Sequence, residues 1–177
     1  NAFLDNRETL DLGPINVDGE STQISARDVQ PDGDIIAVDV CEEFESTSYA
    51  GATAADLAEA VAAVEGLDRR IVASKTDIRD FDALSSALEA GVAELGRLDV
   101  VIANAGICSA AMSWKITPEQ WRETLDVNLT GTFFTVKAAV PILLEQGTGG
   151  SIVMTSSVAG LRGLPFLAHY AASKHGI

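Results

Sequence analysis

The chain has 177 residues, of which 47% are apolar and 21% charged, a balance typical of one globular domain rather than of a disordered chain. Acidic residues outnumber basic ones by 26 to 12, so the net charge of -14 offers no positive surface for the phosphates of nucleic acid or anionic membranes. No apolar run approaches the roughly 18 residues of a spanning helix, and the N-terminus lacks a signal-peptide pattern. We therefore expect a cytoplasmic protein that binds neither nucleic acid nor membranes.

The two cysteines, Cys41 and Cys108, are far apart in sequence and have no metal-ligand spacing. In a reducing compartment such cysteines are most simply small buried apolar residues. We expect neither a disulfide nor a metal site.

The composition changes near residue 33. Residues 1–33 show neither strand alternation nor a helical stripe, and this atypical N-terminal segment fits a loop, an extended arm or partial disorder. From Asp34 onward, short apolar runs alternate with amphipathic stretches, as parallel strands and their crossover helices do. The pattern divides the chain into segment 1–33 and an α/β domain over 34–177.

Four apolar runs in this domain predict strands, because each is rich in β-branched residues and too short for a helix. They cover residues 34–39, 70–74, 98–103 and 151–155.

Three amphipathic stretches between the runs predict helices. Each begins at a residue whose side chain can cap a helix N-terminus, and two end near a glycine, the usual stop residue. The predicted helices start at Thr53, at Asp80 or Asp82, and at Thr117, and the last two end near Gly96 and Gly147, the third with or without a break. The alternation indicates a doubly wound parallel sheet with helices on both faces.

Ligands of such sheets bind beyond the carboxyl ends of the strands, so the residues that follow each run are the first candidates for a site. These residues are Asp39, Asp77, Asn104-Ala105-Gly106 and Ser156-Ser157.

Tyr170 and Lys174 lie four residues apart, which places the phenol and the ammonium on one face of a helix. A neighbouring cation favours the phenolate form, so the pair suits acid/base chemistry at neutral pH. Ser157 could hydrogen-bond a substrate oxygen, and Asn128 could hold a water that relays protons.

Each of these residues also has a purely structural interpretation. Tyr170 could be an ordinary aromatic at a helix start and Lys174 a solvated charge. Ser157 could cap a turn, and Asn128 could mark a helix kink.

Taken together, the motifs resemble the short-chain dehydrogenase/reductase family over residues 34–177, in its order and spacing: Asn104-Ala105-Gly106, Asn128, Ser157 and Tyr170-Ala-Ala-Ser-Lys174. The resemblance implies a Rossmann-like fold. It also implies that Tyr170 is the acid/base and that Lys174 binds the nicotinamide ribose and favours the phenolate. Ser157 would position the carbonyl, and Asn128 would maintain the proton relay.

The same resemblance implies an NAD site. Tyr170 and Lys174 would contact the cofactor, and Asn104, Ala105 and Gly106 would line its cleft. Asp77, or its neighbour Ile78, would approach the adenine. Asp39 would accept hydrogen bonds from the adenosine ribose diol and repel a 2′-phosphate, which favours NAD over NADP.

A narrower resemblance lies in segment 41–57, which is longer than in most family members and is similar to the carveol dehydrogenase group, also described as mycofactocin-coupled. It implies oxidation of a small secondary alcohol such as a terpenol, or reduction of the ketone. Met112, Trp114 and segment 109–113 would flank this substrate, or else pack in a core or lid. A surface loop of variable length is the alternative explanation of segment 41–57.

Two family features are not found in the sequence: the glycine-rich turn that binds pyrophosphate, and the strands after the Tyr-Lys helix. We therefore expect a Rossmann-like sheet that is incomplete at both ends and lacks its centre strand. The family's homo-tetramer is doubtful for such a chain. The alternative to a dehydrogenase is a catalytically inactive truncated product.

Overall fold

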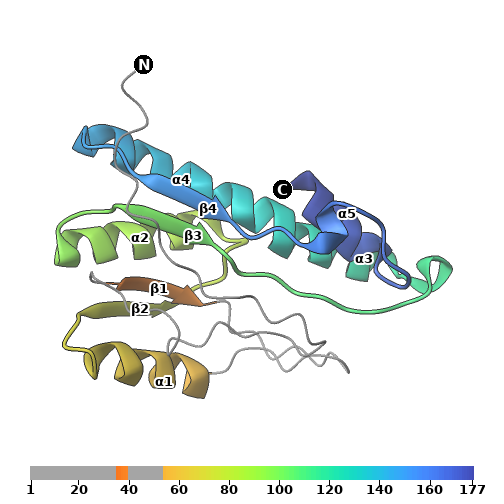
Figure 1. Ribbon diagram of the computed structural model, residues 1–177, viewed down its shortest axis with the longest axis horizontal. Helices are drawn as coiled ribbons and strands as arrows, with labels where there is room; N and C mark the ends of the chain where they lie inside the picture. The colour runs from red at the N-terminus through yellow and green to blue at the C-terminus, as the bar shows by residue number, and fades with distance from the viewer. Residues whose placement is uncertain (1–34, 40–53) are drawn as a thin grey trace.

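The computed structural model describes residues 35–39 and 54–177, with side chains described over 54–177 (Figure 1). The predicted N-terminal segment 1–33 lies outside these residues. So do Cys41 and all but the last four residues of segment 41–57.

Four strands form where the apolar runs predict them: β1 (Ile35–Asp39), β2 (Ile71–Lys75), β3 (Val100–Ala103) and β4 (Ser151–Met154). They pair in parallel as β1 with β2 and β3 with β4. Asp39 lies opposite Lys75 at the carboxyl end of the first pair, and Ala103 lies opposite Met154 at that of the second. The candidate site residues that follow β3 and β4 therefore start from the same edge.

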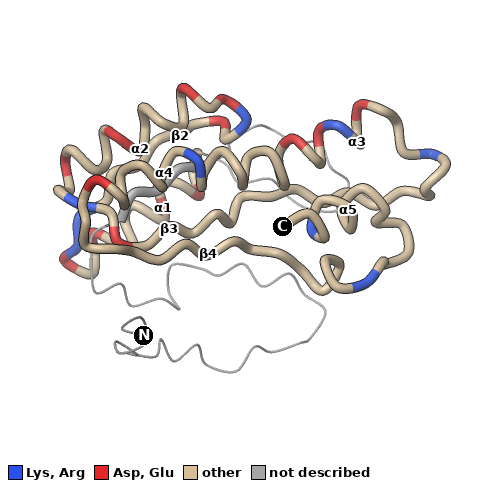
Figure 2. The backbone as a smooth tube through the Cα atoms, turned by 90° about the horizontal axis from the view of Figure 1, so that it is seen from above, with Lys and Arg blue, Asp and Glu red and all other residues tan. Residues whose placement is uncertain are grey.

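The described strands make two separate pairs rather than one sheet (Figure 1). Among the described residues no strand joins the two pairs, and the expected lack of a centre strand stays a prediction. Both β3 and β4 are uncharged (Figure 2), and the side chains of Val100, Ile102 and Val153 are at least half exposed. One face of this pair is therefore not covered by any described element.

Helices flank the strands as predicted: α1 (Ala54–Glu65), α2 (Phe81–Leu95), α3 (Pro118–Leu125), a π-helix η2 (Asp126–Gly131), α4 (Thr132–Gln146) and α5 (Ala168–Gly176), with short 3-10 turns η1 (Ser113–Lys115) and η3 (Val158–Gly160). Helix α1 contacts β2, α2 contacts β1 and β2, and α4 contacts β3 and packs along α2. These contacts confirm the α/β class.

The helix ends follow the sequence signals. The Asp80 side chain accepts a hydrogen bond from the Ala83 N–H at 3.0 Å and caps α2, which ends at Gly96 with a φ of 97°. Thr117 and Gln120 form both bonds of a capping box, at 3.2 and 3.0 Å, at the start of α3.

The break allowed for in the third helix is the π-helix η2, which begins two residues before Asn128. The run Pro118–Gln146 is long and apolar enough to cross a membrane by length and composition, with a mean hydropathy of 1.5. It packs against α2, α5 and β3, however, and the core helix of a soluble protein meets the same criterion. The run is therefore weak evidence for a membrane span.

Two apolar clusters pack the elements together. One joins Ile78, Leu84 and Val127, and the other joins Leu98, Val101 and Ala139. The predicted strand 98–103 starts later than expected because the Gln146 side chain takes the place of a strand partner at Leu98. Its Oε1 accepts the Leu98 N–H and its Nε2 donates to the Leu98 carbonyl, both at 2.7 Å.

Candidate active site

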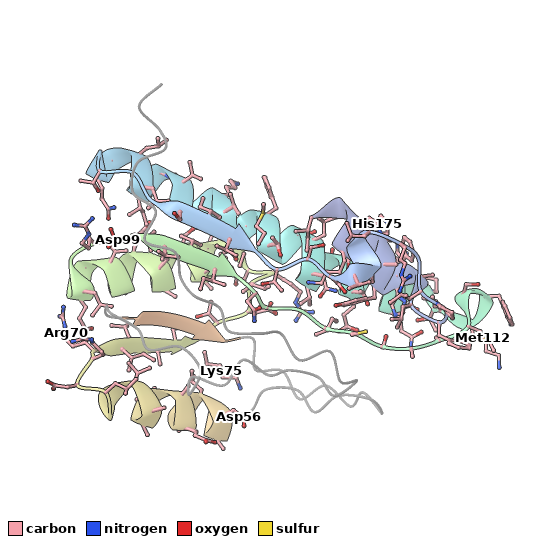
Figure 3. All side chains as sticks on the ribbon, in the orientation of Figure 1. Asp56, Arg70, Lys75, Asp99, Met112 and His175 are labelled. Carbon is pink, nitrogen blue, oxygen red and sulfur yellow. The ribbon has the colours of Figure 1, made fainter. Side chains whose placement is uncertain are left out.

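The candidate site lies at the carboxyl ends of β3 and β4. Figure 3 shows Met112 and His175 toward this end of the molecule, and Arg70 and Asp99 at the opposite end. The Thr155 hydroxyl, just after β4, donates a hydrogen bond of 2.9 Å to Oδ1 of Asn104, just after β3. This bond joins the two strand ends.

Asn128 is fully buried, with no exposed surface. Its Oδ1 accepts the Ile107 N–H at 2.7 Å, and its Nδ2 donates to the Ile107 carbonyl at 2.9 Å and to the Ser173 hydroxyl at 3.0 Å. The side chain therefore ties the π-helix both to the segment after β3 and to α5. The expected relay water is not tested by these contacts. They show that the Asn128 side chain itself is committed to protein partners.

Lys174 is buried, with 5% of its surface exposed, so it is not the solvated charge of the structural interpretation. Its Nζ donates to the Thr155 carbonyl at 2.7 Å and lies 5.8 Å from the centre of the Tyr170 ring. Burial lowers the pKa of Lys174, because an ammonium away from water loses hydration. An ammonium has three N–H groups, so this geometry leaves two for other partners.

Gly106 lies against both buried groups. A Cβ atom at this position would be 3.2 Å from Oδ1 of Asn128 and 3.5 Å from Nζ of Lys174. The glycine thus keeps the approach to Lys174 open. Cys108, two residues on, is a free thiol that is half-buried rather than buried as expected, and burial raises its pKa.

Ser157 caps the turn η3: its Oγ accepts the Ala159 N–H at 3.1 Å. The capping role uses a lone pair of the hydroxyl and leaves its proton for another acceptor. Capping of η3 and a hydrogen bond to a substrate oxygen are therefore compatible roles for the Ser157 hydroxyl.

Tyr170 is half-buried in the first turn of α5, and its carbonyl accepts a hydrogen bond of 2.7 Å from the Ser173 hydroxyl.

The residues expected at the adenosine end lie at the ends of β1 and β2. Asp39 is the last residue of β1. The carboxylate of Asp77 binds Arg79 through the Nε, at 2.8 and 3.0 Å, and through the main-chain N–H at 2.9 Å. These hydrogen bonds hold the pKa of Asp77 below its usual range.

The side chain of Ile78 is buried, and Ala105 is partly buried. The side chain of Ile78 is 4% exposed and packs with Leu84 and Val127, and Ala105 packs against the same cluster. Any contact of Ile78 with a ligand would therefore come from its main chain.

A cavity of about 330 Å³ lies between the segments that precede α3 and α5, and its lining includes Met112, Trp114, Leu164, Pro165, Phe166 and Ala168. The Ala111 N–H donates to the Phe166 carbonyl at 2.9 Å, which joins the two segments. Met112 and Trp114 are 40% and 77% exposed, so they are not core residues. The cavity adjoins the start of α5, two residues before Tyr170.

Sequence reasoning missed four residues that hold the site together: Ile107, Thr155, Ser173 and His169. The first three act through hydrogen bonds to Asn128, Lys174 and Tyr170 that span up to 45 residues of sequence. No local pattern signals such contacts. His169 could have been noted as a histidine next to the candidate tyrosine.

A sequence model of the short chain dehydrogenase family matches residues 33–177. The chain belongs to this family. The candidate residues Asn104, Asn128, Ser157, Tyr170 and Lys174 all lie within the matched range.

Relatives of this short-chain dehydrogenase include carveol dehydrogenases. The (-)-trans-carveol dehydrogenase of Rhodococcus erythropolis is 43% identical over 145 residues, which cover 81% of this chain and 52% of the relative. The crystal structure of carveol dehydrogenase from Mycobacterium avium in complex with NAD has a TM-score of 0.77 and 50% identity, and the match covers 81% of this chain and 52% of that one.

A short chain dehydrogenase from Mycobacterium paratuberculosis bound to NAD has a TM-score of 0.75 and 48% identity, over 80% of this chain and 53% of that one. These matches confirm the Rossmann-like fold. The chain spans about half the length of the curated relatives it matches.

Proposed function

We propose that the protein is an NAD-dependent oxidoreductase that transfers a hydride between a secondary alcohol, or its ketone, and the nicotinamide. The observation that carries this proposal is the buried Lys174 ammonium 5.8 Å from the Tyr170 ring, beside the fully hydrogen-bonded Asn128. Burial of an ammonium costs free energy, and ionisable groups with shifted pKa values gather at functional sites, so the buried Lys174 beside a phenol supports an acid/base role for the pair.

The donor set fits the nicotinamide ribose end of NAD. Lys174 has N–H groups to spare for ribose hydroxyls, and Gly106 leaves the space in front of them open. Two relatives were crystallised with NAD, which supports the same cofactor here. Asp39, at the carboxyl end of β1, would accept hydrogen bonds from the adenosine ribose diol and disfavour NADP. No glycine-rich turn for the pyrophosphate occurs among the described residues.

NAD, when bound, supplies the hydride acceptor for alcohol oxidation. The Tyr170 oxygen takes the proton of the substrate hydroxyl, and the Lys174 ammonium lies 5.8 Å from the centre of the Tyr170 ring. The Ser157 hydroxyl donates to the substrate oxygen and holds it near Tyr170. Asn128 keeps the main chain around Ile107 in place, and a water near it would return the proton to solvent.

The apolar cavity beside α5 supports a substrate without charge. Its Met112, Trp114 and Phe166 side chains suit a terpenol-like ring such as that of carveol, the alcohol that names two of the relatives. A lid that packs against other parts of the protein is the alternative role of Met112 and Trp114. The expected mycofactocin coupling is supported only by the relationship to this group.

The oligomeric state and the cellular location of the protein stay predictions. Helix α4 exposes Phe133 and Leu144, at 59% and 75%, and these side chains would suit a family-type tetramer contact. The expected cytoplasmic location rests on the composition of the sequence.

Calorimetry of NAD binding to the complete protein tests the proposal, with NADP as the competitor and carveol oxidation followed at 340 nm. The Tyr170→Phe variant should bind NAD as the wild type does and lose most of its turnover, while Trp121→Phe, on α3, serves as a control. Unchanged turnover in Tyr170→Phe would remove Tyr170 from the mechanism. A folded protein without NAD binding would instead support the catalytically inactive product.

A further inference from the structure

His169 is a buried histidine that the mechanism above does not use. Its side chain is 1% exposed and is the largest of the fully buried side chains among the described residues. Nε2 lies 2.8 Å from the Ser109 hydroxyl, whereas Nδ1 has no hydrogen-bond partner in the described part of the chain. Burial lowers the pKa of His169, so the ring is neutral at pH 7.

The contacts of the ring indicate where its single proton lies. A proton on Nδ1 would leave a buried N–H group without an acceptor, which folded proteins rarely tolerate. A proton on Nε2 lets the ring donate to the Ser109 hydroxyl and leaves only a lone pair unpaired. The geometry therefore favours the Nε2–H form of His169.

The hydrogen bond between His169 and Ser109 lies at the start of α5, a helix end without a side-chain cap. Leu167 stands at the N-cap of α5, and no side chain caps that helix start. Two hydrogen bonds instead join this region to the segment after β3: His169, in the first turn of α5, binds Ser109, and the carbonyl of Phe166, just before the N-cap, accepts the Ala111 N–H at 2.9 Å. The residue that follows His169 is Tyr170.

The main chain of Tyr170 is therefore fixed from two directions. On one side the Ser173 hydroxyl, which also binds Asn128, donates to the Tyr170 carbonyl at 2.7 Å. On the other side the preceding residue is bound to Ser109. An apolar side chain of similar size would fill the same volume without an unpaired nitrogen. What the imidazole adds is the directional hydrogen bond to Ser109.

We propose that His169 is a positioning residue that, through its hydrogen bond to Ser109, sets the place of Tyr170 relative to Lys174 and the substrate oxygen. The inference rests on the proposed function for its effect on catalysis. The hydrogen bond itself is independent of that function, so each part has its own readout.

Three variants of the complete protein test the catalytic part. His169→Phe and Ser109→Ala should each lower kcat at least about tenfold while the Kd for NAD stays within about twofold. The double variant should lose no more than the worse single variant. His169→Gln keeps an N–H donor and should recover kcat to within about threefold of the wild type. His175→Gln, an exposed neighbour on the same helix, is the matched control.

Nitrogen NMR of the histidines tests the hydrogen bond without any activity. The chain has two histidines, so the His175→Gln variant leaves the His169 signals alone. At pH 7 we expect the Nε2–H pattern, with an Nε2 shift that changes in Ser109→Ala. If wild-type protein oxidises no alcohol but gives this pattern, the proposed function fails and the hydrogen bond stands. A doubly protonated or Nδ1–H ring would overturn the inference, as would unchanged kcat in both His169→Phe and Ser109→Ala.

Discussion

The side chain of Asn128 binds both main-chain polar groups of Ile107. Oδ1 accepts the Ile107 N–H at 2.7 Å, and Nδ2 donates to the Ile107 carbonyl at 2.9 Å. The two bonds join the main chain of Ile107 to the π-helix. They fix Gly106, the neighbour of Ile107, in front of Lys174. Asn128 thus shapes the site through the main chain of the segment after β3.

Replacement of Asn128 by Ala should lower the free energy of unfolding by about 2–4 kcal/mol, because it removes the side chain that binds the partly buried N–H and carbonyl of Ile107 and the buried Ser173 hydroxyl. Urea unfolding of the complete protein measures the loss. Asn104→Ala is the matched control, since Asn104 is exposed and accepts one described hydrogen bond, from Thr155. Equal losses in the two variants would contradict the role of the Asn128 contacts.

Gly106→Ala should lower kcat/KM about tenfold with little loss of stability, a cost of about 1.4 kcal/mol in the transition state. The new Cβ would lie 3.2 Å from Oδ1 of Asn128 and 3.5 Å from Nζ of Lys174, so it would crowd the approach to the ammonium. Steady-state kinetics with an alcohol and NAD measure the effect. Gly163→Ala, where a Cβ would meet nothing within 4 Å, should leave kcat/KM unchanged. A normal Gly106→Ala enzyme would show that this approach is not used.

Local signals predicted the secondary structure well. The Asp80 cap, the Thr117–Gln120 capping box and the stop at Gly96 act between residues a few positions apart, so the sequence displays them directly. Ser157 follows a strand, and Tyr170 and Lys174 share a helix face, so the sequence pattern also singles these residues out as candidates. Asn128 lies in the π-helix and has no such signal, and the catalytic roles of all four residues stay predictions.

The supporting contacts of the site could not be predicted in the same way. The carbonyl of Thr155 that binds Lys174 has no sequence signature, because every residue has a carbonyl. The late start of β3 depends on Gln146, which lies 48 residues beyond Leu98. Burial of Lys174 and His169 is likewise decided by packing between elements, and composition does not reveal it.

Gly131→Ala should destabilise the protein by about 1–3 kcal/mol, the usual cost of extra volume in a packed core. Within a helix, Ala normally gains about 1 kcal/mol over Gly. Here a Cβ would be 2.6 Å from Cγ1 of Ile78, whose side chain is 4% exposed and cannot move aside freely. Thermal and urea unfolding, with Gly163→Ala as control, measure the difference. A more stable Gly131→Ala variant would show that the Ile78 side chain can move away from the new Cβ at little cost.

Asp39→Ala should narrow the preference for NAD over NADP about tenfold, because it removes the carboxylate that repels a 2′-phosphate. The position of Asp39 at the carboxyl end of β1, opposite Lys75, supports this role. Calorimetric Kd values for both cofactors give the ratio. Asp99→Ala, at the other end of the strands, is the control for a change in net charge. An unchanged ratio would mean that another residue selects the cofactor.

The stability of the protein should fall in mild acid because of His169. Burial lowers the pKa of this histidine from its ordinary value of 6.5. Below about pH 6.5 the unfolded chain therefore binds a proton at this ring that the folded chain resists, and the free energy of unfolding decreases as the pH falls through that window. His169→Gln has no such proton to bind.

Urea unfolding of both proteins at several pH values from about 7.5 to about 5 separates His169 from the other groups, because the remaining titrating residues are common to both. The unfolding free energy of the wild type minus that of His169→Gln should decrease as the pH falls toward about 5. A difference independent of pH would show that the His169 ring titrates alike in the folded and unfolded chain, as a solvated imidazole does.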